Sequence, residues 1–180
     1  MTAPALLTKL FGAPEEINGR ERCPTYLYRW IIYGNRKRDS LTGRIFGKPR
    51  FKIYLHKFVH DDWSRDLHDH PKRFISIGLK GGYIEWTPCR LCNIGGVPCG
   101  VENQKLFLAP WFRSFPAEHI HRLTMLQDHT GKDLPCWTLV IVLQGTREWG
   151  FWHLGKFIPW REYVQSDTAD AMKACGGPDD

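Results

Sequence analysis

Four of the eight histidines stand in two His-X-His pairs. His68 and His70 form the first pair, and His119 and His121 form the second, about fifty residues later. In an extended strand, residues at i and i+2 point to the same face, so each pair aims two imidazoles in one direction. Imidazole suits Zn, Fe, Ni and Cu, and three protein nitrogens beside an open position are typical of a catalytic site. If the two strands are neighbours, the spacing predicts a divalent metal site.

These pairs lie among short aromatic and β-branched segments that are bounded by Gly, Pro, Asn or Asp, as strands usually are. The segments are 24–33, 50–59, 72–79, 82–86, 104–108, 111–115, 120–126, 136–143 and 147–153. We expect the first two to pair, and we expect hairpins at Lys80-Gly81 and at Gln144-Gly145. About eight to ten short strands predict an all-β closed barrel or jelly roll with a ligand or metal at its mouth.

The 180 residues fit one domain, 1–180, with a barrel core at about 24–160. We expect a short N-terminal arm or helix, an inserted Cys-rich loop at 88–101, and a C-terminal helix at about 160–175. The longest apolar runs are far shorter than the roughly 20 residues of a membrane helix, and the N-terminus does not read as a secretory signal. A cytoplasmic protein is therefore expected.

Residues 62–125 resemble the cupin superfamily, whose two motifs are G(X)5HXH(X)3-4E(X)6G and G(X)5PXG(X)2H(X)3N. His68 and His70 match the first motif, and Pro116 and His121 match the second. The resemblance implies a cupin-type double-stranded β-helix, or jelly-roll barrel, in which these three histidines hold a metal. Residues 50–165 also look like small uncharacterised cupin proteins of phages and proteobacteria, so a phage-encoded protein would act in the host cytoplasm.

The chain departs from the motifs at the metal-binding glutamate, where Phe74 or Ile75 stands. It also departs at the two opening glycines, at the second-motif glycine and at the asparagine, where Asp62, Pro110, Glu118 and Met125 stand. Cupins with three histidines alone include thiol dioxygenases that hold Fe(II). The resemblance therefore implies Fe(II) first, with Zn, Mn or Ni as alternatives. The fourth ligand stays open between water and three side chains, namely His119, Glu118 and Glu85.

The resulting hypothesis is a metal-dependent, dioxygenase-like enzyme that acts on a small anionic molecule inside the barrel. The alternatives are a non-catalytic binding or sequestering protein, such as a sensor or phage accessory protein, and a structural barrel component. Arginines near the motifs are candidate anion-binding residues, since a guanidinium binds carboxylate or phosphate in a bidentate manner. They are Arg73, Arg113, Arg122 and Arg147. Glu85 and Glu118 are candidate general acids or bases whose pKa burial would raise.

Six cysteines in a chain without an apparent export signal are interpreted as thiols or metal ligands. Cys89, Cys92 and Cys99 are candidates for a second, structural zinc, with Cys136 or Cys23 as a fourth ligand. Free loop thiols and a redox pair at the CxxC are the alternatives.

The net charge of +6 favours anionic partners, yet the basic residues are mostly scattered, and nucleic-acid binding is not favoured. A small-molecule ligand is expected as the partner, and a homodimer is an open possibility, as in other cupins. His60-Asp61-Asp62, together with His121, imitates the two-His, one-carboxylate triad of oxoglutarate-dependent oxygenases. A polar loop is the simpler interpretation of that segment.

Overall fold

The computed structural model describes residues 3–18, 25–34, 50–62, 66–89, 101–145, 147–153 and 155–165. Strands make up most of the described chain, which confirms the predicted all-β class. The elements are α1 (Ala3–Phe11), β1 (Glu15–Ile17), β2 (Leu27–Tyr33), β3 (Lys52–Phe58), β4 (Leu67–His68), β5 (Phe74–Lys80), β6 (Gly82–Pro88), β7 (Glu102–Leu108), β8 (Trp111–Phe115), β9 (Arg122–Met125), β10 (Cys136–Val142), β11 (Gly150–His153), β12 (Lys156–Pro159) and α3 (Trp160–Gln165).

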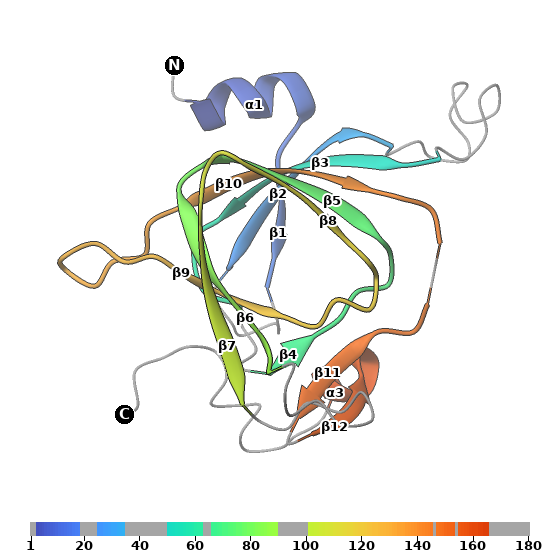
Figure 1. Ribbon diagram of the computed structural model, residues 1–180. Helices are drawn as coiled ribbons and strands as arrows, with labels where there is room; N and C mark the ends of the chain where they lie inside the picture. The colour runs from blue at the N-terminus through green and yellow to red at the C-terminus, as the bar shows by residue number, and fades with distance from the viewer. Residues whose placement is uncertain are drawn as a thin grey trace.

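The strands form two faces of a barrel (Figure 1). One face is a six-stranded sheet in the order β1-β2-β3-β10-β5-β8. The other consists of two three-stranded sheets, β7-β6-β9 and β12-β11-β4, which are linked by an antiparallel bridge between His121 and His68. Every strand pairing within the sheets is antiparallel, as a jelly roll requires. The predicted pairing of the first two long strands is confirmed by the β2–β3 register.

The two predicted hairpins are wrong, because the chain changes sheets at both places. β5 pairs with β10 and β8, whereas β6 pairs with β7 and β9. Gly81, at the junction, has a φ of 79°, and a Cβ there would lie 2.4 Å from the carbonyl oxygen of Pro135. Likewise β10 pairs with β3 and β5, and β11 pairs with β12 and β4. A glycine between two strands marks a sharp turn but does not say whether the strands then pair.

The interior of the barrel is lined by alternate residues of its strands, as the two-residue period of a strand requires. Lys52, Tyr54, His56 and Phe58 of β3 all line one interior cavity. Trp30 lies on the opposite face of the sheet, where its ring stacks on that of Trp137 at 5.7 Å, and α1 packs against β2. Polar side chains therefore share the barrel interior with aromatic ones.

A hydrophobic cluster of Tyr83, Leu123, Met125 and Cys136 closes the core between the two faces. Gly78 of β5 belongs to the same region, since a Cβ there would lie 2.2 Å from the Trp111 ring. Gly78→Ala is expected to cost about 1–3 kcal/mol of unfolding free energy through overpacking, measurable by urea denaturation. In a Trp111→Leu background the additional cost of Gly78→Ala should be smaller, and a Gly78→Ala protein as stable as wild type would contradict the expected clash.

The helices near the two ends of the chain agree with the predicted ones where the structure describes them. α1 corresponds to the predicted N-terminal helix, and α3 begins at Trp160 as expected, while residues 166–175 lie outside the described residues. Tyr163 anchors α3, because its ring stacks on Phe151 at a centroid distance of 4.0 Å. Neither described helix is long and apolar enough to span a membrane.

Candidate metal centre

His68 of β4 and His121, the residue before β9, face each other across an isolated antiparallel bridge. The amide of His68 donates to the carbonyl oxygen of His121 at 2.8 Å, and the reverse bond measures 2.9 Å. The amide of His70 donates to Ala117 at 2.9 Å, so this histidine lies beside the same segment. The ligating atoms of the three histidines lie within 4.8 Å of one another. The structure thus brings together the three histidines that the spacing singled out.

The nitrogens of these imidazoles meet at chelating distance. Nε2 of His70 lies 2.9 Å from Nε2 of His121. Two metal–nitrogen bonds of about 2.1 Å at a right angle would separate their nitrogens by about 3.0 Å. Nδ1 of His68 is buried without a hydrogen-bond partner. A donor pair at this separation, beside a third imidazole with an unused buried nitrogen, fits a divalent cation.

All three imidazoles favour their neutral form, which is the form that binds metal. Burial and the neighbouring histidines lower the pKa of His68 to about 3. The same causes, with Arg147, hold the pKa of His70 well below its ordinary value. Burial lowers the pKa of His121 too, although Glu85 opposes that shift.

Asp69, between the two histidines of the first His-X-His pair, helps to hold their backbone in position. Its side chain is 2% exposed and points away from the two histidines. One carboxylate oxygen accepts from Nη1 of Arg147 at 2.6 Å, and the other accepts from the amide of Gly150 at 2.9 Å. Arg147 also donates to the carbonyl oxygen of His70 at 3.2 Å. The Asp69–Arg147 pair therefore holds the backbone that carries both imidazoles.

Glu85 of β6 supports the site from the opposite side of His121. Its Oε1 lies 2.8 Å from Nδ1 of His121 and 3.0 Å from Nε2 of His119, and its Oε2 accepts from Arg113 at 2.6 Å. Burial alone would raise the pKa of Glu85, but these hydrogen bonds outweigh it and hold the pKa well below the ordinary value. The ionised carboxylate keeps the proton of His121 on Nδ1 and leaves Nε2 free to bind metal.

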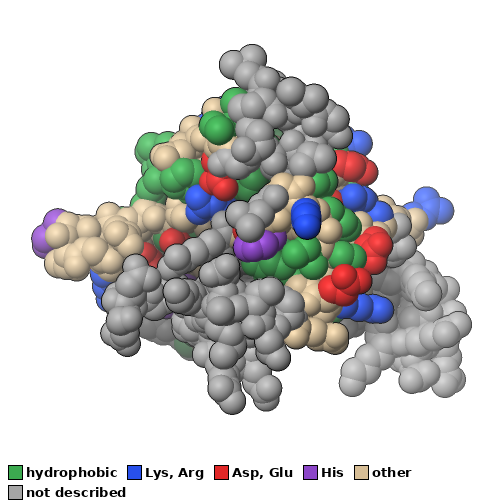
Figure 2. Space-filling view, turned by 90° about the horizontal axis from the view of Figure 1, so that it is seen from below, with side chains coloured by type: hydrophobic (Ala, Val, Ile, Leu, Met, Phe, Trp, Pro, Cys, Tyr) green, Lys and Arg blue, Asp and Glu red, His purple; other side chains and the backbone are tan. Residues whose placement is uncertain are grey.

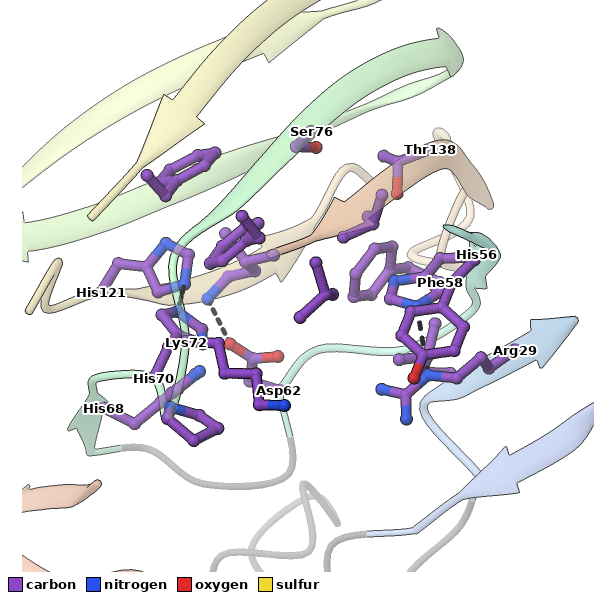
Figure 3. Close-up of a pocket in the computed structure, with 18 of the residues that line it drawn as sticks. Arg29, His56, Phe58, Asp62, His68, His70, Lys72, Ser76, His121 and Thr138 are labelled. Carbon is purple, nitrogen blue, oxygen red and sulfur yellow. Dashed lines mark hydrogen bonds between the residues drawn. The ribbon is translucent and has the colours of Figure 1, made fainter. Parts of the chain in front are cut away.

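A cavity of about 500 Å³ opens beside the histidines. In Figure 3, His68, His70 and His121 lie on one side of it, and Arg29 and His56 lie on the other. Its wall includes apolar side chains, among them Phe58, Phe74, Val140 and Val142. From below, histidine atoms reach the surface between hydrophobic and basic side chains (Figure 2). The cavity is large enough for a small molecule.

The four predicted anion-binding arginines have protein partners and are not among the described residues that line this cavity. Arg147 pairs with Asp69 and Arg113 with Glu85, as described above. Arg122 pairs with Glu102 at 2.7 Å, and Arg73 donates to the Ser114 hydroxyl at 3.3 Å. The cationic residues that do line the cavity are Arg29, Lys52 and Lys72, which the sequence analysis did not single out.

The other predicted site residues divide between the cluster and the surface. His119 joins Glu85 and His121 in a second group with metal-ligand geometry. The side chain of Glu118 is 70% exposed and lies 4.0 Å from Arg147, away from both groups. His60 is exposed and pairs with Asp133 at 2.9 Å, so it does not form a triad with His121.

Of the candidate zinc ligands, Cys92, Cys99 and Cys23 lie outside the described residues, while Cys89 follows the end of β6. Cys136 is fully buried in the hydrophobic cluster, where burial raises the pKa of its thiol to about 12. This position does not suit a thiolate ligand.

Asp62 is a cavity residue whose role the sequence did not reveal. Its Oδ2 accepts from the amide of Leu123 at 2.7 Å, which ties the segment before β4 to β9. Burial and the neighbouring charge of Asp61 raise the pKa of Asp62 to about 7, against the effect of that hydrogen bond. The carboxyl group can therefore exchange a proton near neutral pH.

No family model matches the chain, and no curated protein matches it in sequence. Among solved structures, the polyketide cyclase RemF from Streptomyces resistomycificus is 14% identical over 88% of this chain and 87% of that chain, with a TM-score of 0.49. The DMSP lyase DddQ from Ruegeria pomeroyi DSS-3 is 14% identical over 80% and 65%, with a TM-score of 0.45. The hydroxypropylphosphonic acid epoxidase from S. wedmorenis is 11% identical over 73% and 55%, with a TM-score of 0.43. We base no conclusion about this chain on likenesses with TM-scores below 0.5.

Proposed function

We propose that this protein is a metal-dependent enzyme that binds one divalent cation through His68, His70 and His121 and acts on a small anionic molecule in the barrel cavity. The observation that carries the proposal is the convergence of three imidazoles, with ligating nitrogens within 4.8 Å of one another, beside a cavity of about 500 Å³. A bound divalent cation would supply Lewis-acid chemistry or, if it is iron, redox chemistry. Iron(II) is the first choice, ahead of zinc, manganese and nickel, because the site resembles the three-histidine centres of cupin dioxygenases.

The protein's own residues position and protonate the ligand in this proposal. Glu85 and Asp69 hold His121 and the first histidine pair in place. The apolar wall excludes water around the ligand. Asp62 lines the same cavity, and with a pKa of about 7 its carboxyl group can give or take a proton.

Metal content per chain tests the proposal and also decides between the two groups that share His121. We expect about one divalent ion per chain in anaerobically purified protein, and less than about a tenth of that in His68→Ala, since three ligands are needed for tight binding. His119→Ala is the matched control, which should keep its metal. The reverse result would assign the metal to Glu85, His119 and His121, and full occupancy in both variants would overturn both sites.

Capture of an anionic molecule without turnover is the second candidate. It is favoured by the state of Glu85, because three donors hold this carboxylate in its ionised form and leave it a poor proton acceptor. Oxygen consumption by the iron-loaded protein with a panel of thiols, phenols and carboxylates separates the two candidates. Uptake that is lost in Asp62→Asn would support the enzyme, whereas binding of a panel member without any turnover would support capture.

A further inference from the structure

Arg29 of β2 presents a guanidinium to the cavity on the side away from the histidine cluster (Figure 3). Its Nε donates to Nε2 of His56 at 3.1 Å, and its guanidinium carbon lies 4.9 Å from the centre of the Tyr54 ring. Its terminal nitrogens make no hydrogen bond to any described residue, since Glu15 approaches Nη1 only to 3.8 Å. Two neighbours thus hold the guanidinium while its fork of N–H donors stays open.

His56 acts as an acceptor that fixes this arginine. The imidazole is 7% exposed, and burial together with the charge of Arg29 holds its pKa well below the ordinary value. Because Nε2 accepts from Arg29, the single proton of the neutral ring lies on Nδ1. Among the described residues that line the cavity, Asp62 is the one carboxylate, while Glu15, which is not a lining residue, pairs with Arg29 at 3.8 Å.

Thr138 of β10 provides an independent sign of a polar ligand at this end. It lies directly opposite His56 in the β10–β3 register and lines the cavity. The residue is 1% exposed, and its hydroxyl has no hydrogen-bond partner. Buried polar atoms are nearly always paired, so an unpaired hydroxyl on a cavity wall indicates a partner from outside the protein.

The distance between the two ends of the cavity limits the shape of the ligand. β2 and β5 are separated by β3 and β10, which places them roughly 14 Å apart at about 4.8 Å per strand. His70 packs against Phe74 at the start of β5, with ring centroids 4.7 Å apart. Val140 and Phe58 line the wall between the two ends. A ligand that touches both ends needs an apolar middle.

We propose that Arg29 is the binding site for the carboxylate of an elongated, largely apolar monocarboxylate, whose other end lies at the histidine cluster. This inference rests on the proposed function only in stating that the end of the ligand at the histidine cluster is the end that reacts. The guanidinium fork donates two parallel hydrogen bonds to the carboxylate oxygens.

Calorimetric titration with 4-phenylbutyrate and its neutral isostere 4-phenylbutyramide tests this site. The wild-type protein should bind the carboxylate at least tenfold more tightly than the amide, since a hydrogen bond to a charged group adds about that much. Arg29→Gln should weaken carboxylate binding about 10- to 100-fold and remove the preference over the amide. Arg29→Lys keeps the charge but loses the fork, so an intermediate loss is expected even if the glutamine variant folds poorly. The exposed Arg161→Gln is the matched control that should change nothing.

Metal content is measured on the same samples, as purified and after treatment with EDTA, so that the two proposals can fail separately. Arg29-dependent carboxylate binding that survives EDTA supports the site even if no metal is present, in which case only the proposed function fails. A carboxylate preference that persists in Arg29→Gln and vanishes with EDTA would assign the carboxylate to the metal and overturn the inference. Absence of carboxylate binding by the wild type would overturn it as well.

Discussion

Acidification from pH 7 to pH 5 is expected to lower the free energy of unfolding of the metal-free protein by up to about 5 kcal/mol. Burial depresses the pKa of four histidines, His56, His68, His70 and His121, below the 6.5 of an unfolded chain. Each therefore contributes stability that is present above pH 6.5 and is lost as the pH falls, at about 1.4 kcal/mol per proton and pH unit.

Asp62 works in the opposite direction and reduces the effect. Its pKa is raised from 3.8 to about 7, so its contribution to stability is present at low pH and is lost as the pH rises through 7. Between pH 6 and pH 5 the unfolded chain binds up to four more protons at the histidines and one fewer at Asp62. The net uptake on unfolding is then about three protons, which gives the slope of the expected loss.

Urea unfolding at a series of pH values with EDTA present measures this slope. His56→Gln should reduce the proton uptake by about one, whatever it does to stability at pH 7. His60→Gln is the matched control, because the side chain of His60 is 54% exposed. A stability that stays flat or rises between pH 6.5 and pH 5 would contradict the neutral state of the buried histidines.

The first histidine pair and the strands were predictable because both depend on local spacing, whereas His121 was added to the pair by the resemblance to the cupin motifs. Side chains two residues apart on an extended strand lie on the same face, so His68 can be placed beside His70 without knowledge of the fold. The same relation cannot say which strands become neighbours. Lys80-Gly81 has the composition of a hairpin turn, yet the strand that follows it, β6, pairs in the other sheet. Gly81 packs against the carbonyl oxygen of Pro135, and the local sequence does not reveal this distant contact.

Partners that depend on strand register could not be predicted. Glu85 lies beside His121 only because β6 and β9 pair with Glu85 opposite Leu123. Arg29 and His56 meet through the β2–β3 register, in which they are direct partners. The sequence did contain one signal of a polar cavity wall, because polar residues of β3 alternate with apolar ones. A polar-inward interior departs from the usual expectation for a strand, and it occurs here because the barrel encloses a cavity.

Glu85→Ala is expected to destabilise the protein by about 3–5 kcal/mol. The carboxylate is 2% exposed and accepts from Arg113, His119 and His121. Its removal leaves the guanidinium of Arg113, itself 20% exposed, without a counter-charge and leaves two imidazoles without their acceptor. Breaking a buried ion pair on one side costs this much because the remaining charge stays desolvated.

Glu85→Gln separates the orienting role of the carboxylate from its contribution to stability. The amide keeps the shape of the side chain but accepts more weakly from Nδ1 of His121, so the imidazole loses its fixed tautomer. We expect metal affinity to fall about 10- to 100-fold, measured by competition with a chelator, while the protein stays folded at pH 7. Glu118→Gln, on a side chain that is 70% exposed, should leave affinity and stability unchanged. If Glu85→Gln binds metal as tightly as wild type, the orientation of His121 is set by its bridge to His68 alone and not by Glu85.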